Sequence, residues 1–277
     1  MKISRMINVD LDSYYDKSYL CYKLSNSWIN SRLKKNIDSA IYNGTPLYSA
    51  DKMNKLWRNK RPYCIYDDSV YVDSDYRYYI IKDVYGWGVP CKESIDLISK
   101  YAEDRVIFDI GCGTGMMSAM LSHRHKVISL DNKSESFDYE YVDIKRCNVI
   151  NDDNIYEKEK NPFVILVYLR NNVLFHSFKK APIGTRFYIH IPFLATDTEF
   201  MNIAAQVLFS SEILTFDIKD WFDSKVRLHE GVIIEKVKDF KYDEKFNILK
   251  YMLDFTLNDY AIKLDWLEFI KICNTLL

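Results

Sequence analysis

The stretch VIFDIGCGTGMMSAML, residues 106–121, decides the fold of this chain. It opens as an apolar run typical of a strand buried on both faces, passes through three glycines within five residues, and continues as an apolar helix. The whole chain has only eight glycines, so this concentration is unusual. Glycine adopts positive φ freely, and its missing Cβ lets a ligand lie against the main chain. We therefore expect a strand, a ligand-binding loop and a helix in direct succession.

The spacing of the glycines separates two classes of nucleotide-binding loop. Dinucleotide-binding proteins carry G-x-G-x-x-G directly after the strand. Here Asp109 is followed by Gly111, Gly113 and Gly115, so the third glycine comes one residue early. This spacing disfavours a nicotinamide cofactor. Cys112 lies inside the loop, where a small side chain suits close packing, and we expect it to line the site rather than to act as a nucleophile.

A second acidic residue follows at the distance expected for a nucleotide site. Asp131 comes twenty residues after Gly111 and ends the apolar segment KVISLD, residues 126–131. A carboxylate at the end of the neighbouring strand can accept hydrogen bonds from both hydroxyls of a ribose. We therefore expect Asp131 to contact a ribose and the adjacent Asn132 to line the same site.

Strand and helix patterns alternate between residues 85 and 240, which predicts an α/β fold with a doubly wound, mainly parallel sheet. The expected helices cover 92–102, 114–123, 171–180 and 198–210, and the clearest strands cover 105–110, 126–131, 162–169 and 186–192. A weaker strand falls either at 139–144 or at 146–150. The last two strands, 212–218 and 226–237, are joined by a short connection, so they must be antiparallel.

Two segments flank this central part. Residues 1–84 hold 12 of the 22 tyrosines, one glycine, and 14 Lys or Arg against 10 Asp or Glu. We expect them to form a partly helical extension that packs on the central domain. Residues 241–277 return to a helical apolar pattern and predict a C-terminal helical extension. Each extension is a candidate surface for a protein partner.

The glycine loop with Asp109, followed by Asp131, resembles motif I and the next acidic position of class I S-adenosylmethionine (SAM)-dependent methyltransferases. The segment YGWGVP, residues 85–90, is similar to a little-characterised group of microbial methyltransferase-like proteins. The resemblance covers about residues 80–240. It implies a Rossmann-like methyltransferase fold, a SAM-binding core at 85–240, and SAM as the cofactor of a methyltransferase.

The resemblance also implies roles for individual residues. Asp109 and the three glycines would hold the methionyl part of SAM, and Asp131 the ribose. Trp87 and Pro90 would close one side of the pocket. An acidic or amide side chain after the third strand would contact adenine. Asn151 and Asp152 have the right position if that strand is 146–150, and Asp143 is the competitor if it is 139–144.

The fourth strand is atypical for the family at the point where catalytic residues are expected. Base-modifying amino-group methyltransferases carry Asp/Asn-Pro-Pro-aromatic there, whereas this chain reads Tyr168-Leu169-Arg170-Asn171. Tyr168 and Arg170 are the candidates for orienting a substrate. The methyl acceptor, whether a small molecule, a protein or a nucleic acid, is not identified by the sequence. A catalytically inactive methyltransferase-fold protein that binds or stimulates a partner stays an alternative.

The amino-acid composition limits which other classes of protein this chain can belong to. Hydrophobic residues make up 48% of the 277 positions and charged residues 28%, as in ordinary folded proteins. A net charge of −1 gives no overall attraction to nucleic acid or to an anionic membrane. The six cysteines form no C-x-x-C pair, so we expect neither a disulfide framework nor a metal site. No apolar stretch approaches the roughly 18 residues of a membrane span. We expect a soluble, cytoplasmic protein.

Overall fold

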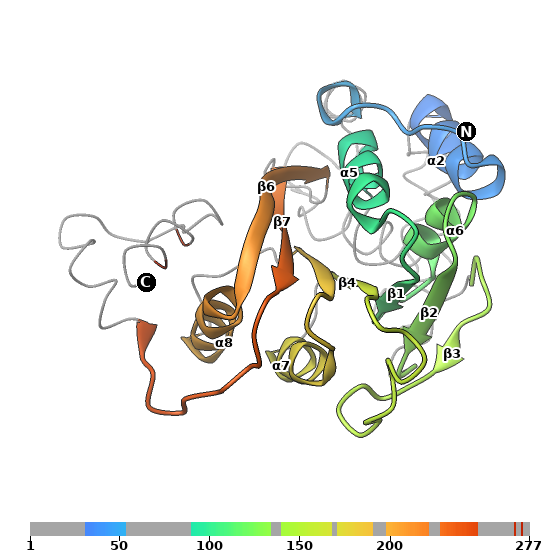
Figure 1. Ribbon diagram of the computed structural model, residues 1–277. Helices are drawn as coiled ribbons and strands as arrows, with labels where there is room; N and C mark the ends of the chain where they lie inside the picture. Colours follow the sequence, from blue (N-terminus) through green and yellow to red (C-terminus); the bar gives the residue numbers. More distant parts are fainter. Residues whose placement is uncertain are drawn as a thin grey trace, which may run out of the picture.

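The structure is a computed structural model that describes residues 31–53, 90–133, 140–167, 171–190, 198–221, 228–248, 269 and 273. Within these ranges a seven-stranded sheet lies between two layers of helices (Figure 1). Its strand order is β3-β2-β1-β4-β5-β7-β6. The predicted α/β class is confirmed.

Five strands of the sheet are parallel: β1 (Ile107–Ile110), β2 (Val127–Asp131), β3 (Lys145–Arg146), β4 (Phe163–Val167) and β5 (Arg186–His190). The last strand in sequence, β7 (Leu228–Lys236), runs antiparallel between β5 and β6 (Ser211–Trp221). The expected terminal hairpin is therefore present, and its second strand is inserted next to the parallel part of the sheet.

Helices cover both faces of the sheet because successive strand residues point to opposite sides. On one face, α5 (Lys92–Ala102) packs with Ile107 and Tyr188 in a core cluster, and α6 (Met116–Ser122) lies beside it. On the other face, α7 (Asn171–Lys180) and α8 (Thr198–Phe209) form a larger cluster with Phe108, Leu166 and Phe187. The apolar strands thus form a sheet that is buried on both sides.

The third strand differs from both sequence predictions. It consists of Lys145 and Arg146 alone, so it follows the first candidate segment and shares a single residue, Arg146, with the second, and in the described part of the chain it pairs with β2 at the edge of the sheet. Both side chains are exposed and charged. A two-residue edge strand needs no apolar alternation, so hydrophobic periodicity could not locate it.

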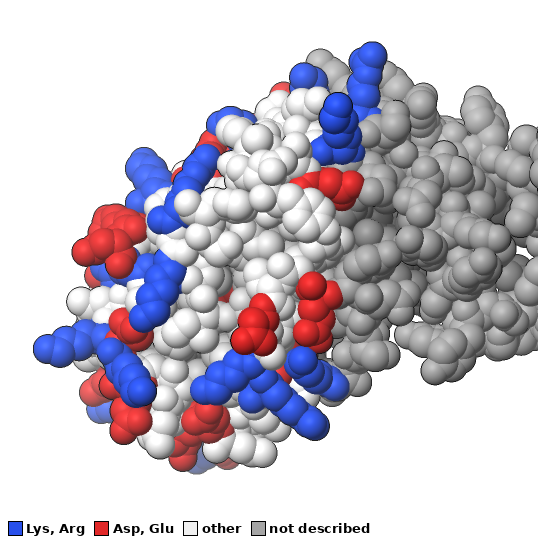
Figure 2. Space-filling view, turned by 90° about the vertical axis from the view of Figure 1, so that its right-hand side faces the viewer, with Lys and Arg blue, Asp and Glu red and all other residues white. Residues whose placement is uncertain are grey.

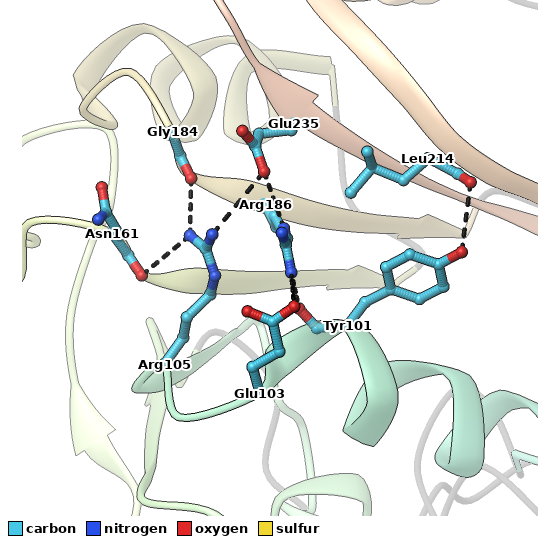
Figure 3. A network of polar contacts seen from close by, with 8 residues as sticks. All are labelled: Tyr101, Glu103, Arg105, Asn161, Gly184, Arg186, Leu214 and Glu235. Atoms are coloured by element: carbon cyan, nitrogen blue, oxygen red, sulfur yellow. Dashed lines mark hydrogen bonds and ion pairs between the residues drawn. The ribbon is translucent and has the colours of Figure 1, made fainter.

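The amino ends of the parallel strands are tied together by two arginines (Figure 3). Just before β1, Arg105 donates to the carbonyl oxygens of Gly184 at 2.7 Å and Asn161 at 3.3 Å. At the start of β5, Arg186 donates to Glu235 at 2.8 Å and to Glu103 at 2.9 Å. This network fixes the sheet at the edge opposite the glycine loop.

The helix α2 (Ser31–Asn43) packs against α6. Gly44 follows its last residue: its amide still donates to the carbonyl oxygen of Ala40, and its φ of +64° turns the chain out of the helix. A Cβ at Gly44 would lie 2.6 Å from Cγ of His123, and the His123 ring nitrogen Nε2 lies 3.0 Å from the Ile41 carbonyl oxygen. The end of α2 and the end of α6 are therefore interlocked.

At the other end of the chain, residues 243–248 lie against α8. The Gln206 side chain donates to the carbonyl oxygen of Asp243 at 3.1 Å and accepts from its amide at 2.6 Å. Ile248 donates its amide to Asn202 at 2.8 Å. Beyond residue 248 only Phe269 and Cys273 belong to the described residues, and both are buried. In the described residues, no helix combines the length and the apolar character that crossing a membrane requires.

Candidate functional site

The glycine loop leaves β1 and turns directly into α6. The amides of Gly111 and Cys112 both donate to the Leu130 carbonyl oxygen, at 2.7 and 3.1 Å, which holds the loop against β2. Gly111, Gly113 and Gly115 all have positive φ, of 71°, 57° and 73°. Residues with a Cβ are strained in that region, so the predicted need for glycine at these positions has a direct backbone cause.

Gly115 is also required by packing. A Cβ added there would lie 2.5 Å from Cγ2 of Val142, which is closer than nonbonded carbon atoms approach. The neighbouring Tyr141 donates its amide to the Thr114 carbonyl oxygen at 2.9 Å. The segment before β3 therefore rests on the loop and supports it from one side.

Asp131 turns its carboxylate toward the glycine loop. The Gly113 amide donates to Oδ2 at 3.0 Å, and the Lys133 amide donates to Oδ1 at 2.6 Å. Lys133 has a positive φ of 52°, which is uncommon for a residue other than glycine. The Asp131 side chain is half-buried. Each carboxylate oxygen has two acceptor positions, so one on each oxygen is still available for a ligand.

A second carboxylate lies beneath the same loop. Asp109, near the end of β1, is 4% exposed and accepts a hydrogen bond from Ser118 of α6 at 2.6 Å. Burial raises the pKa of Asp109 to about 6, the nearby charge of Asp131 acts in the same direction, and the Ser118 hydrogen bond opposes them. Two carboxylates and three glycines thus meet at the carboxyl edge of β1 and β2.

Cys112 lies between two of the glycines and is half-buried. Burial raises the pKa of its thiol, and the charges of Asp109 and Asp131 raise it further. Nucleophilic cysteines are thiolates at neutral pH. The environment of Cys112 therefore keeps it protonated and unreactive.

The segment after β3 is bonded at its start to Asp131 and is held in place from α7. The Cys147 amide donates to the main-chain oxygen of Asp131 at 2.9 Å, and its thiol lies 3.5 Å from Oδ2 of Asp152. From the end of α7, Lys180 donates to the carbonyl oxygens of Val149, Ile150 and Asp152 at 2.8 to 3.1 Å. Asn151 is exposed in the turn between them, and Asp143 is exposed before β3.

Three residues singled out by the sequence, Trp87, Tyr168 and Arg170, lie outside the described residues. Pro90 is described and is buried immediately before α5. Among the described residues, no group of three or more His, Cys, Asp or Glu side chains is arranged to hold a metal ion.

His190, the last residue of β5, was not among the residues predicted to form the site. It is 1% exposed and its ring stacks on Tyr188, with ring centroids 6.4 Å apart and an angle of 11° between the planes. It pairs in register with Val167, the last residue of β4. A polar residue at the carboxyl end of an apolar parallel strand is the signal that could have identified it.

The side of the molecule formed by α2, α6 and β2 carries a mixed surface. Figure 2 shows Lys and Arg interspersed with Asp and Glu over this face rather than gathered into a field of one sign. Ion pairs such as Lys133 with Glu140, at 3.1 Å, contribute to this pattern. The described part of this face therefore offers no broad basic surface for a polyanion.

No protein-family model matches this chain, and no curated protein matches it. Among solved structures, it is similar to a 1,6-didemethyltoxoflavin-N1-methyltransferase from Burkholderia thailandensis, with 13% identity and a TM-score of 0.42 over 63% of this chain and 94% of that one. A TehB-like SAM-dependent methyltransferase from Corynebacterium glutamicum is 17% identical, with a TM-score of 0.41 over 60% and 98%.

A third structure, a putative methyltransferase from Streptococcus mutans in complex with S-adenosylhomocysteine (SAH), is 19% identical, with a TM-score of 0.36 over 54% of this chain and 98% of that one. The chain's own sheet is more informative, because the order β3-β2-β1-β4-β5-β7-β6, in which β7 runs opposite to the other strands, is the layout expected of class I methyltransferases. On this topology, the chain has the Rossmann-like methyltransferase fold.

Proposed function

We propose that this protein binds SAM at the carboxyl edge of β1 and β2 and transfers its methyl group to an acceptor. The observation that supports this most is the placement of the Asp131 carboxylate against the glycine loop, where the Gly113 amide binds it at 3.0 Å. An acid at the end of β2, turned toward a loop of small residues at the end of β1, suits an adenosyl group.

Asp131 would bind the ribose. Its two oxygens are already oriented by the amides of Gly113 and Lys133, so little side-chain freedom is lost when a ligand arrives. The acceptor position left on each oxygen matches the two neighbouring hydroxyls of a ribose.

Asp109 and the glycines would hold the methionyl part. The amino group of that part is a cation, and Asp109 is a buried carboxylate whose pKa of about 6 leaves it mostly ionised at neutral pH. An ionised carboxylate buried at this cost is more often found at a binding site than in an ordinary core. When bound, SAM supplies a methyl group activated by its sulfonium, so that positioning of the acceptor provides much of the catalysis.

The other assignments belong to the same proposal. Cys112 and Asn132 would line the pocket, Asn151 or Asp152 would contact adenine, and Trp87 and Pro90 would close one side. Tyr168 and Arg170 would orient an acceptor, which could be a small molecule, a protein or a nucleic acid.

Calorimetric titration of the full chain with SAH tests the proposal. We expect binding in the micromolar range or tighter, and a loss of about 10- to 100-fold in Asp131→Ala, because a charged hydrogen-bond acceptor is removed. Asp104→Ala removes an exposed acid at the opposite edge of the sheet and serves as the matched control. Absence of binding to the wild-type chain, or equal binding by both variants, would contradict the proposal. If SAH binds but no methyl group reaches RNA, DNA, protein or small-molecule pools, the non-catalytic alternative is favoured.

A further inference from the structure

Three side chains of the acidic, basic and histidine types are deeply buried among the described residues: Asp109, His190 and Lys236. Lys236 has a structural task, because its ammonium donates to the carbonyl oxygens of Phe178 at 3.0 Å and Ala181 at 2.6 Å and so completes the end of α7. Asp109 belongs to the glycine loop. His190 belongs neither to a helix end nor to the glycine loop: it is the last residue of β5, at the carboxyl edge of the sheet, where open α/β sheets bind their ligands.

Strand alternation places His190 on the same face of the sheet as the two carboxylates. Ile189 belongs to the core cluster on the α7 and α8 side, so its neighbour His190 points to the α5 side. On β1, Ile110 lies in that same cluster and Asp109 points the other way, and on β2 the same holds for Leu130 and Asp131. Three polar side chains therefore share one face at the carboxyl edge of an apolar sheet.

The order of the strands fixes the order of these three side chains along the carboxyl edge of the sheet. Asp131 is on β2, Asp109 on β1, and His190 on β5, with β4 between β1 and β5. If Asp131 of β2 holds the ribose and Asp109 of β1 the methionyl part, as proposed, the strands that come next along the carboxyl edge are β4 and β5. Neighbouring strands are about 4.8 Å apart, which places His190 about 10 Å from β1. A methyl acceptor bound beside the cofactor would occupy the space between β1 and His190.

The His190 ring is held by a specific arrangement. Tyr188 stacks on it, and Gly231 of β7 makes room for the tyrosine, since a Cβ at Gly231 would lie 2.5 Å from Cε2 of Tyr188. Gly231 is also the residue paired in register with His190. Glycine weakens a strand and is found where something must approach the backbone closely. The missing side chain at Gly231 leaves the space that the Tyr188 ring occupies beside His190.

We propose that His190 accepts the proton that the methyl acceptor loses during transfer, and that the acceptor is a hydroxyl or amino group. This rests on the proposed function. The oxygen or nitrogen of the acceptor forms its bond to the methyl carbon as the carbon–sulfur bond breaks, and its proton moves to a nitrogen of the neutral imidazole. Imidazole suits this task because its ordinary pKa lies near neutral pH.

Nuclear magnetic resonance of the full chain, labelled with nitrogen-15 in its five histidine rings, tests this inference. His190→Gln assigns the His190 signals. We expect a shift of the His190 resonances when SAH is added, and a further shift when SAM replaces SAH, because SAM carries a positive charge on its sulfur that SAH lacks. His176, on α7 at the other face of the sheet, is the internal control and should respond to neither ligand.

The outcomes separate the two proposals. If calorimetry shows SAH binding while His190 gives the same signals with SAH and SAM, the inference is wrong and the proposed function stands. A His190 ring that carries both protons at pH 7 also overturns the inference, since it has no site for another proton. If neither SAH nor SAM binds, the proposed function fails and the role of His190 fails with it.

Discussion

The carboxylate of Asp131 and the amide of Gly113 are joined by a hydrogen bond of 3.0 Å that links the end of β2 to the middle of the glycine loop. The loop is therefore ordered by the same side chain that we propose for the ribose. A residue with both tasks should affect stability as well as ligand binding, and the two effects can be measured separately.

Replacing Asp131 by alanine should lower the free energy of unfolding by about 1–3 kcal/mol, because the amides of Gly113 and Lys133 lose their acceptor. Denaturant unfolding followed by circular dichroism measures the change. Asp104→Ala, which removes an exposed acid, should stay within about 0.5 kcal/mol of the wild type. Equal midpoints for the two variants would show that the carboxylate does not order the loop.

Asp109→Asn should stabilise the protein at neutral pH. Burial raises the pKa of Asp109 from 3.8 to about 6, so the folded state binds the proton more tightly than the unfolded state does. Wild-type stability therefore falls as pH rises from about 4 to about 6 and stays lowered above that. The wild type loses about 3 kcal/mol of unfolding free energy in this way. Asparagine carries no charge, so the variant does not lose it.

The measurement for Asp109→Asn is thermal or denaturant unfolding of both proteins at pH 4, 5, 6 and 7. Their stabilities should coincide near pH 4 and diverge toward pH 7, while SAH binding by the variant weakens. A variant that is less stable than the wild type at pH 7 would contradict the assignment of a buried, energetically unfavourable carboxylate.

Gly115→Ala should destabilise the loop for two independent reasons. The residue has a φ of +73°, which costs a residue with a Cβ about 1–2 kcal/mol, and the new methyl group would meet Val142 at 2.5 Å. The double variant Gly115→Ala/Val142→Ala removes the clash and keeps the backbone strain. The double variant should therefore lose less stability than the sum of the losses in Gly115→Ala and Val142→Ala. Strictly additive losses in the four unfolding measurements would exclude the clash.

Lys236→Met should destabilise the fold, because the carbonyl oxygens of Phe178 and Ala181 lose their buried donor at the end of α7. We expect about 2–4 kcal/mol in denaturant unfolding. Burial lowers the pKa of Lys236, so the unfolded state holds the proton more tightly. The wild type should then gain stability relative to the variant as pH rises toward 10.5. A stability difference that is constant from pH 8 to 10 would contradict the lowered pKa.

Helices with a strong apolar period were predicted accurately, as α5 at 92–102 and α7 at 171–180 show. The sheet class and the hairpin also followed from the sequence, because a short connection between strands forces them to be antiparallel. The edge strand Lys145–Arg146 could not be found in this way, since pairing with β2 and not burial creates it.

The residues of the candidate site could be proposed from the sequence, but their contacts could not. Asp109, Asp131 and the glycines were identified by spacing, whereas the bond from Gly113 to Asp131 depends on how β1 and β2 are aligned in the sheet. His190 escaped notice because a single histidine in an apolar strand has the same pattern whether it is packed or functional. The roles of all these residues stay predictions, as do those of Trp87, Tyr168 and Arg170.

The arginine network at the amino edge has a consequence for motion. Arg105 and Arg186 fasten the beginnings of β1 and β5 to Glu235 and to the loops before β4 and β5 (Figure 3). The amino ends of these strands are thereby fixed, so local opening of the sheet should occur mainly at their carboxyl ends. Amide hydrogen exchange should be slowest beside these arginines and should be faster toward the carboxyl ends of the parallel strands, where we propose that SAM binds.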